Sequence, residues 1–412
     1  PLILQGARQV GKTYSILEFG RTHYENVAYF NFETNPKLNA TFEENISPDY
    51  LIPILSHIAS QTIVKEKTLI VFDEIQLCER ALTSLKYFCE DAPDYHIIVA
   101  GSLLGVAVNR EKFSFPVGKV DMKTLYPMDM EEFMLALGED DLVEEIKNSF
   151  HNNTPLPSSL HDIAMQLYRQ YLVVGGMPEC VMQFAETKDY ILVRHTEDTI
   201  LASYLNDMSK YNNLNEIKKT RLAYDNITVQ LSKKNTRFQY KLIKKGVRAS
   251  EFKNAIEWLC LSGIVSQVYK VEQIKKPLEN YRDIDSFKIY VSDLGLLCAK
   301  KDLTANDILY MVDEINDFKV GMAENYVNVQ LSINGYHTYY WESERGAEID
   351  FIIQRDGLLI PIEVKSADNT RAKSLKVYMD AYNPAYAIKI SAKNFGFEDN
   401  KKIVPLYAAF CI

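Results

Sequence analysis

The residues best suited to chemistry lie at the start of the chain, in the run GARQVGKT at positions 6–13. Glycine, four further residues and then Gly-Lys-Thr is the spacing typical of a phosphate-binding loop. Such glycines let backbone N–H groups curl round the β- and γ-phosphates of a nucleotide, Lys12 adds a positive charge, and the Thr13 hydroxyl suits Mg²⁺. A plain glycine turn between a strand and a helix is the structural alternative. The predicted nucleotide-binding residues are Gly6, Ala7, Arg8, Gln9, Val10, Gly11, Lys12 and Thr13.

An apolar run at 68–72 ends in two acids, Asp73 and Glu74, which is the pattern of a Walker B strand. A continuous apolar run is expected of a strand buried on both faces of a parallel sheet. We expect Asp73 to hold Mg²⁺ together with Thr13, and Glu74 to act as a catalytic residue that polarises the attacking water. The acids could also do no more than end the strand. The crossover geometry of a parallel sheet favours the shared metal, because it brings strand ends together.

A third polar group follows the apolar run at 96–100, where Gly101 leads into Ser102. The Ser102 hydroxyl could sense the γ-phosphate or position the water, so Ser102 joins Glu74 and Lys12 as a candidate catalytic residue. A simple turn serine is the alternative. The guanine-selective pattern Asn-Lys-x-Asp does not occur in the sequence, which favours ATP over GTP as the nucleotide.

A second group of charged residues lies in the last quarter of the chain. Glu324 falls in a predicted helix, Asp350 in a predicted strand, and Glu363 and Lys365 in the next predicted strand. Residues two apart on a strand share a face, so Glu363 and Lys365 point the same way. Asp350 on the adjoining strand can then meet them.

This arrangement resembles the PD-(D/E)XK nuclease fold. The resemblance implies that Asp350 and Glu363 hold Mg²⁺, that Lys365 helps to position the hydrolytic water, and that Glu324 is an auxiliary ligand. The short Glu-x-Lys element also arises by chance on exposed strands. Copies of such a fold could serve as binding domains without cutting a phosphodiester bond.

The elements that must position these residues follow from hydrophobic periodicity and from turn and capping residues. In the amino-terminal part we expect strands at 2–4, 27–32, 68–72, 96–100 and 117–127, and helices at 14–19, 36–46, 49–61, 81–89 and 129–137, the last capped by Asp129. Nearer the carboxyl end we expect strands at 286–291, 335–342, 347–353 and 359–365, and a helix at 321–331. Strands that alternate with helices predict an α/β fold with a doubly wound parallel sheet.

The motifs GARQVGKT, LIVFDEIQ, VAGSLLG and LYPMDMEEF, followed by GGMPE at 175–179 and YVSDLGLL at 290–297, resemble the bacterial and archaeal AAA-family ATPases that carry a large uncharacterised carboxyl-terminal region. The resemblance covers nearly the whole chain and implies nucleotide and metal roles for Lys12, Thr13, Asp73 and Glu74. ATPases of this wider class often use an arginine finger. The sequence does not identify one, and the arginines considered are Arg8, Arg110 and Arg194.

The middle of the chain has two characters. The segment 160–211 has a helical pattern, broken only at GGMPE, and resembles a lid over an ATPase sheet. Helices near 227–231, 240–243 and 250–262, with a strand at 264–271, follow the order of a winged helix. This region is basic and could contact duplex DNA through phosphates, although a packing module with a solvated basic face is equally compatible. The residues proposed for DNA contact are Lys233, Lys234, Arg237, Lys241, Lys244, Lys245 and Arg248.

Length and composition set the remaining expectations. A chain of 412 residues suggests several domains, and a net charge of −9 argues against polyanion binding over the whole surface. Six scattered cysteines and the lack of any 18-residue apolar run favour a cytoplasmic protein without a membrane partner. Because Pro1 stands directly in the first predicted strand, we expect a preceding segment.

Together these patterns predict a P-loop NTPase domain, a helical lid, a winged-helix module and a restriction-endonuclease-like α/β domain. The predicted boundaries are 1–150, 151–220, 221–280 and 281–412. The expected function is that of an ATP-binding and ATP-hydrolysing switch associated with DNA, with Mg²⁺ and possible homo-oligomers. The alternative is a signalling or protein-binding switch with an inactive nuclease-like domain and no nucleic-acid partner.

Overall fold

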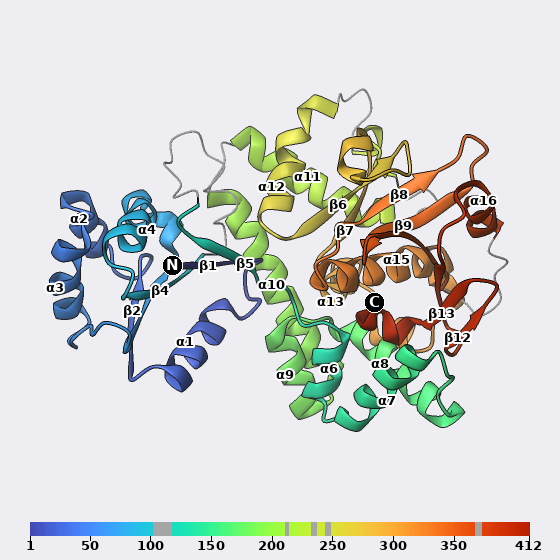
Figure 1. The fold of residues 1–412 in the computed structure, drawn as a ribbon, viewed down its shortest axis with the longest axis horizontal. Coiled ribbons are helices and arrows are strands. Elements are labelled where there is room, and N and C mark those ends of the chain that lie inside the picture. Colours follow the sequence, from blue (N-terminus) through green and yellow to red (C-terminus); the bar gives the residue numbers. More distant parts are fainter. Residues whose placement is uncertain (102–117, 211–213, 232–236, 244–248, 367–372) are drawn as a thin grey trace. The chain divides into compact units, whose positions relative to one another are not determined.

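Each of the two groups of predicted strands builds a sheet of its own in the computed structural model (Figure 1). The structure describes residues 1–101, 118–210, 214–231, 237–243, 249–366 and 373–412. They form two units, Pro1–Tyr126 with Leu261–Gly263, and Pro127–Cys260 with Ile264–Ile412. None of the described helices is both long enough and apolar enough to cross a membrane.

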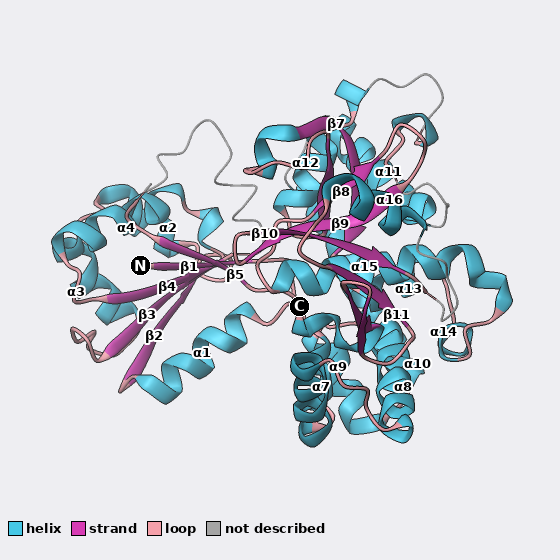
Figure 2. Ribbon diagram, turned by 45° about the vertical axis from the view of Figure 1, so that its right-hand side comes forward, coloured by secondary structure: helices cyan, strands magenta, loops and turns pink. Residues whose placement is uncertain are grey.

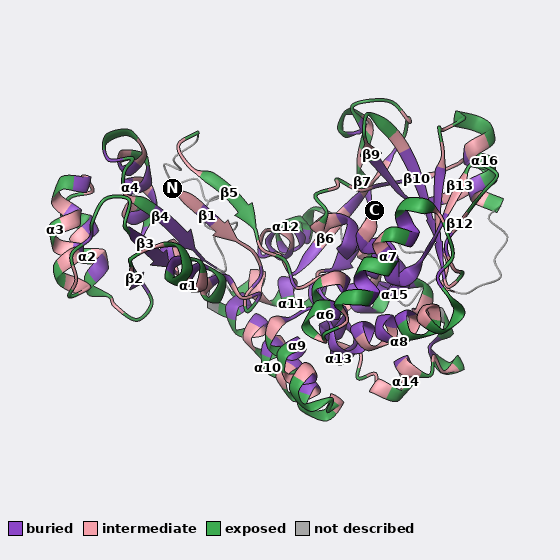
Figure 3. Ribbon diagram, turned by 60° about the horizontal axis from the view of Figure 1, so that its bottom comes forward, coloured by how far each residue is buried: buried purple, intermediate pink, exposed green. Residues whose placement is uncertain are grey.

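The first unit contains the predicted parallel sheet. Its strands are β1 (Leu2–Gln5), β2 (Asn26–Asn31), β3 (Thr68–Asp73), β4 (His96–Ala100) and β5 (Asp121–Thr124), in the order β2-β3-β4-β1-β5. All neighbouring pairs are parallel. The expected α/β fold with a doubly wound parallel sheet is thus confirmed. β3 is buried along its whole length and β5 is exposed, as Figure 3 shows.

Helices cover both faces of this sheet because the strand side chains alternate (Figure 2). Ile70 and Phe72 of β3 face a core formed with α2 (Lys37–Glu44), α3 (Pro48–Ile58) and α4 (Glu79–Asp91). Leu69 and Val71 face Ile16 of α1 (Lys12–His23) on the other side. The predicted helices in this part are therefore present, with ends shifted by a few residues.

The second unit contains an eight-stranded mixed sheet in the order β12-β13-β11-β10-β9-β8-β6-β7. Its strands are β6 (Val265–Val271), β7 (Arg282–Val291), β8 (Tyr339–Glu342), β9 (Glu348–Arg355), β10 (Leu358–Val364), β11 (Ala387–Ser391), β12 (Gly396–Glu398) and β13 (Lys401–Pro405). Its α-helices are α6 (Met130–Ala136), α7 (Asp140–Asn152), α8 (Ser158–Val174), α9 (Pro178–Thr187), α10 (Tyr190–Lys210), α11 (Leu214–Leu231), α12 (Lys253–Leu261), α13 (Leu294–Lys300), α14 (Ala305–Leu309), α15 (Asn316–Ile333) and α16 (Lys373–Tyr382).

Two of the predicted boundaries fall inside packed structure. The boundary at 150 lies within α7, and the boundary at 280 lies between β6 and β7, which pair with each other. β6 also pairs with β8, so the strands of the predicted winged-helix and nuclease-like segments share one sheet. Long-range hydrogen bonds join the predicted lid to the same body, for example from the Leu156 N–H to Asn394 Oδ1 at 3.0 Å. The unit boundary that the structure shows instead follows Tyr126.

The motifs GGMPE and YVSDLGLL meet at one buried carboxylate, that of Asp293. Asp293 caps α13 by accepting a hydrogen bond from the Leu296 N–H at 2.8 Å, and its other oxygen accepts from the Gly176 N–H at 2.7 Å. Gly175 has a φ of 70° and ends α8 as predicted, and a Cβ there would overlap the Asp293 carboxylate. Asp129 also caps α6 as predicted, in a reciprocal pair with Glu132.

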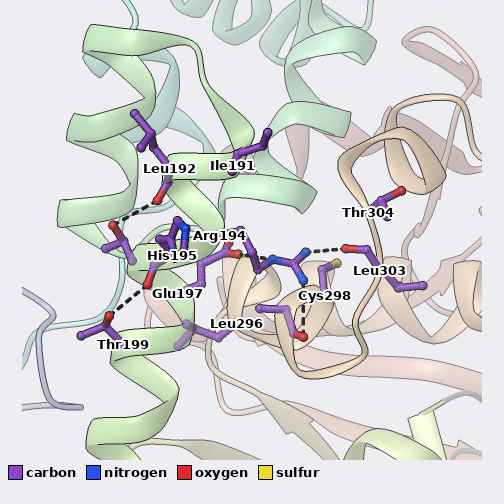
Figure 4. Close-up of polar contacts among 12 residues, drawn as sticks. Ile191, Leu192, Arg194, His195, Glu197, Thr199, Leu296, Cys298, Leu303 and Thr304 are labelled. Atoms are coloured by element: carbon purple, nitrogen blue, oxygen red, sulfur yellow. Dashed lines mark hydrogen bonds and ion pairs between the residues drawn. The ribbon is translucent and has the colours of Figure 1, made fainter.

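Glu197 of α10 lies close to this capped turn. It is 2% exposed and pairs with Arg194, whose Nε lies 3.2 Å from Glu197 Oε2 (Figure 4). Arg194 also donates to the carbonyl oxygens of Ala299, in α13, and of Leu303, just after that helix. Burial raises the pKa of Glu197 to about 9, although Arg194 opposes this shift.

We expect the stability of the second unit to depend on this carboxyl group. Its pKa in the folded chain lies above that of an unfolded glutamate, so its contribution to stability is complete at acid pH and is lost as the pH rises from about 4.5 towards 9. Glu197→Gln should flatten the fall in the free energy of unfolding by at most about 1.4 kcal/mol per pH unit. Tryptophan fluorescence is the suitable measurement, because Trp258 and Trp341 both lie in the second unit. Exposed Glu186 supplies a matched control, and equal pH profiles for both variants would contradict the assignment.

Candidate functional site

The run GARQVGKT forms the loop between β1 and α1. Three of its residues have positive φ, namely Gly6 at 144°, Gln9 at 67° and Gly11 at 91°. A Cβ at Gly6 would overlap the carbonyl oxygen of Leu125, so the first glycine is required by a close approach of two backbones. Gly11 precedes the first residue of α1 and no side chain caps that helix. The unpaired N–H groups at its start are therefore available to an anion.

Lys12 folds back over this loop. Its side chain is largely buried, with 8% of the residue exposed, and Nζ donates to the carbonyl oxygens of Gly6 at 2.9 Å and Ala7 at 2.6 Å. Burial lowers the pKa of Lys12 to about 8, although the carboxylates of Glu74 and Asp73 oppose this shift. The ammonium group thus stands at the phosphate loop, held by backbone carbonyls that a phosphate could replace.

Thr13 and Asp73 meet directly, as a shared metal requires. The Thr13 hydroxyl donates to Asp73 Oδ2 at 2.8 Å. The strand ends are not side by side as expected, because β4 lies between β1 and β3 in the sheet. Thr13 bridges this separation because it stands in the first turn of α1, which packs against β3 and β4. The predicted metal pair is therefore assembled by a helix.

Glu74 follows in a left-handed backbone conformation, with a φ of 52°, at the start of a short 3-10 turn, η1 (Ile75–Leu77). Its carboxylate accepts a hydrogen bond from the side-chain amide of Gln76. Burial raises the pKa of Glu74, and the neighbouring Asp73 acts in the same direction. A carboxylate with a raised pKa is a stronger base, which suits the predicted role.

Two residues of this site are absent from the sequence prediction. The Tyr29 hydroxyl donates to Asp73 Oδ2 at 2.7 Å, so that oxygen serves both Tyr29 and Thr13. Gln76 is the second, through its contact with Glu74. The sequence did hold a signal for Tyr29, because this residue lies in the predicted strand that became β2. That strand pairs with β3, and Tyr29 stands two residues before Asn31, the partner of Asp73. Nothing in the spacing singles out Gln76.

Of the remaining residues predicted for this site, some lie near it, one lies in the second unit and the others lie outside the described residues. β4 ends beside the loop at Ala100, but Ser102 and Arg110 lie outside the described residues. Arg8 lies close enough to Glu74 for its charge to oppose, without reversing, the rise in the Glu74 pKa that burial causes. Arg194 belongs to the second unit, where it holds Glu197 and two backbone carbonyls. The contacts that the structure shows for Arg194 are therefore structural ones within the second unit.

The charged residues near the carboxyl end come together as the pattern predicted. Glu324 of α15, Asp350 of β9 and Glu363 of β10 are all buried, and Lys365 Nζ lies 3.0 Å from Glu363 Oε1. Asp350 Oδ2 accepts the Val364 N–H at 2.7 Å. Burial raises the pKa of Asp350 to about 7, and the nearby Glu324 adds to the shift. Within the described part of the chain, no three His, Cys, Asp or Glu side chains are arranged to hold a metal ion.

The basic segment is only partly described. Of the residues proposed for DNA contact, Arg237 and Lys241 are described and both are exposed. Arg237 stands in a β-bridge with Lys288, and Lys241 lies in a 3-10 turn, η2 (Tyr240–Leu242). The others lie outside the described residues, and they are Lys233, Lys234, Lys244, Lys245 and Arg248.

Three family models match parts of the chain. Residues 1–134 match the family described as AAA domain. Residues 165–307 match a domain of unknown function (DUF8612), and residues 320–409 match another domain of unknown function (DUF4143). None of the curated proteins matches the chain. The winged-helix and nuclease-like assignments therefore stay predictions.

Several solved structures are distantly similar. A Walker-type ATPase of Pyrococcus abyssi has 12% identity and a TM-score of 0.43, over 73% of this chain and 90% of that chain. The ORC2 protein of Aeropyrum pernix has 12% identity and a TM-score of 0.38, over 76% of this chain and 87% of that chain. These values are too low to carry a functional argument. The family match over residues 1–134 supports the prediction of an AAA-type P-loop domain in the amino-terminal part of this chain.

Proposed function

We propose that this chain binds ATP with Mg²⁺ at the loop of residues 6–13, hydrolyses it, and uses the change of nucleotide state as a switch. The observation that carries the proposal is the hydrogen bond of 2.8 Å between Thr13 and Asp73, beside the glycine loop and the buried Lys12 ammonium. A hydroxyl, a carboxylate, an ammonium and free helix N–H groups at one point suit a magnesium-bound triphosphate.

Each residue has a distinct part in this reaction. The backbone N–H groups of the loop and the Lys12 ammonium bind and orient the phosphates, while Thr13 and Asp73 would hold Mg²⁺. The bound ion would neutralise charge that develops on the phosphate oxygens. Glu74 orients the attacking water and accepts its proton, with Gln76 fixing the position of the carboxylate.

The groups of the site are paired with one another, which supports the idea of a switch. Lys12 donates to two loop carbonyls, and Thr13 donates to Asp73. Nucleotide and metal must replace both sets of contacts, because a phosphate needs the ammonium and a metal needs the two oxygen atoms. Binding therefore changes the hydrogen-bonding state of β3 and of the start of α1 together.

Substitutions at Lys12 and Glu74 should separate binding from turnover. Lys12→Ala should abolish measurable ATP affinity and hydrolysis, because the phosphates lose their buried counter-charge. Glu74→Gln should keep ATP binding and lower the hydrolysis rate by about 10²–10⁴-fold, the usual worth of a general base. Fluorescent nucleotide titration and phosphate release measure the two quantities. Lys65→Ala removes an exposed lysine of the same unit as a control. Unchanged affinity in Lys12→Ala would refute the nucleotide site.

Proton uptake should accompany nucleotide binding at alkaline pH. The pKa of Lys12 is about 8 in the free chain, and bound phosphates raise it because they stabilise the ammonium form. Above pH 8, binding should therefore take up as much as one proton, and the affinity should fall as the pH rises. Calorimetry at pH 8.5 in two buffers of different ionisation enthalpy measures this proton count. Lys12→Arg should bind without the uptake, because an arginine stays charged. Equal heats for wild type in both buffers would contradict the assignment.

We further propose that the basic segment from Lys233 to Arg248 associates with duplex DNA. The support is its charge, since seven Lys or Arg residues occur there without an acid. A nucleotide switch that meets a protein partner in place of DNA is the alternative. DNA that stimulates ATP hydrolysis would favour the first reading, and indifference to DNA would favour the second.

Charge reversal tests the DNA proposal. Lys244→Glu with Lys245→Glu should weaken duplex binding for all sequences and reduce the slope of log affinity against log salt by about two, one for each lost phosphate contact. Fluorescence anisotropy at several salt concentrations gives this slope. The control is a double reversal of Lys373 and Lys376, both exposed on α16. If the control and the test variant behave alike, the segment has no special role.

A further inference from the structure

A lysine that the sequence pattern does not include stands among the carboxylates near the carboxyl end. Lys288 belongs to β7 and is 1% exposed. Its Nζ lies 3.3 Å from Glu324 Oε2 and 3.9 Å from Asp350 Oδ1, and it also pairs with Glu348. One ammonium group thus serves a carboxylate from α15 and two from β9.

The surroundings of Lys288 hold it in this position. The Tyr290 hydroxyl, from the same face of β7, donates to Glu324 Oε2 at 2.9 Å. The ring of Tyr340 lies under the ammonium, with its centroid 5.3 Å from Nζ. Burial alone would lower the pKa of Lys288, but Glu324 and its neighbours outweigh it and keep that pKa well above the usual range. These carboxylates are the counter-ions of the buried ammonium group.

We propose that the Lys288 ammonium takes the place of the divalent cation that the nuclease-like pattern implies, so that Glu324 and Asp350 bind no metal in this chain. A Mg²⁺ ion needs these carboxylate oxygens at about 2.1 Å in near-octahedral geometry. The ammonium lies between the same two oxygens, and a second cation there would meet both its charge and its volume.

The remaining carboxylate of the pattern is also engaged within the chain. Glu363 Oε1 pairs with Lys365 Nζ at 3.0 Å, while Glu363 Oε2 is buried without a hydrogen-bond partner. Lys365 is thus a counter-ion in this arrangement. The group as a whole joins β7, β9 and α15 through one buried lysine. Its role in the fold is to connect β7 at the edge of the sheet to β9 and to α15, all within the predicted nuclease-like segment.

Removal of the lysine should uncover a metal site. Lys288→Ala leaves the carboxylates without their ammonium and makes room for an ion, so the second unit should melt at lower temperature and regain stability with Mn²⁺ or Mg²⁺. Tryptophan fluorescence follows this unit alone, since both tryptophans lie in it and the nucleotide site lies in the other. Lys270→Ala, which breaks the Lys270–Glu342 pair in the same sheet, is the matched control and should show no metal response.

The double variant Lys288→Ala with Asp350→Asn should lose the metal response, because it lacks one of the ligands. Calorimetric titration of nucleotide-free wild type and Asp350→Asn with Mn²⁺ gives a second measurement that does not depend on the folding of Lys288→Ala. Identical titrations of those two proteins support the proposal. Mn²⁺ binding that wild type shows and Asp350→Asn loses would overturn it, as would a Lys288→Ala protein that folds and stays indifferent to metal.

Discussion

The hydrogen bond between Thr13 and Asp73 is the constraint on which the first unit depends. It requires β3 to end at Asp73, α1 to begin at Lys12, and the loop between β1 and α1 to turn through residues with positive φ. Side chains of β3 point alternately to the helices on the two faces of the sheet, and this packing fixes where the carboxyl end of β3 lies along α1. The packing of the core and the geometry of the site therefore depend on the same register of β3. A shift of one residue along this strand would turn its side chains to the opposite faces and move Asp73 away from Thr13.

The second unit rests on a different kind of interaction. Its sheet brings together strands separated by long stretches of chain, and Lys288 connects three of its elements through charge. Apolar residues of similar volume often stabilise a core as well as a buried ion pair does. A buried lysine among carboxylates is more selective, since any other register would leave charges without partners. We therefore see these charges as fixing how β7, β9 and α15 are placed within the unit, more than how strongly they are held.

Much of the first unit could be predicted from the sequence, because its signals are local. The glycine loop and the apolar run before Asp73 each identify their own element, and the structure has both. The Asp129 cap does the same for α6 of the second unit. Local signals did not predict that β4 lies between β1 and β3, because the order of strands depends on how distant segments pack. Gln76 was missed because a glutamine carries no chemical signature of its own, and Tyr29 was missed because only its place in a predicted strand pointed to it. In the second unit, Glu324, Asp350, Glu363 and Lys365 were grouped together from the sequence. Lys288 was not included, because it lies outside the spacing of the nuclease-like pattern although its strand was predicted.

The capping contact at Asp293 has a consequence for how this protein can be divided or recombined. Its carboxylate holds the Gly176 N–H, from a segment more than a hundred residues earlier, as well as its own helix start. A fragment that stops ahead of α13 would leave the turn at Gly175 without its acceptor, and the apolar sides of α8 and α10 without the helix they pack against. The helical segment and the large sheet therefore behave as one inseparable body. A hybrid protein in which either part is exchanged with that of a related protein would need both Asp293 and the Gly175-Gly176 turn from the same parent.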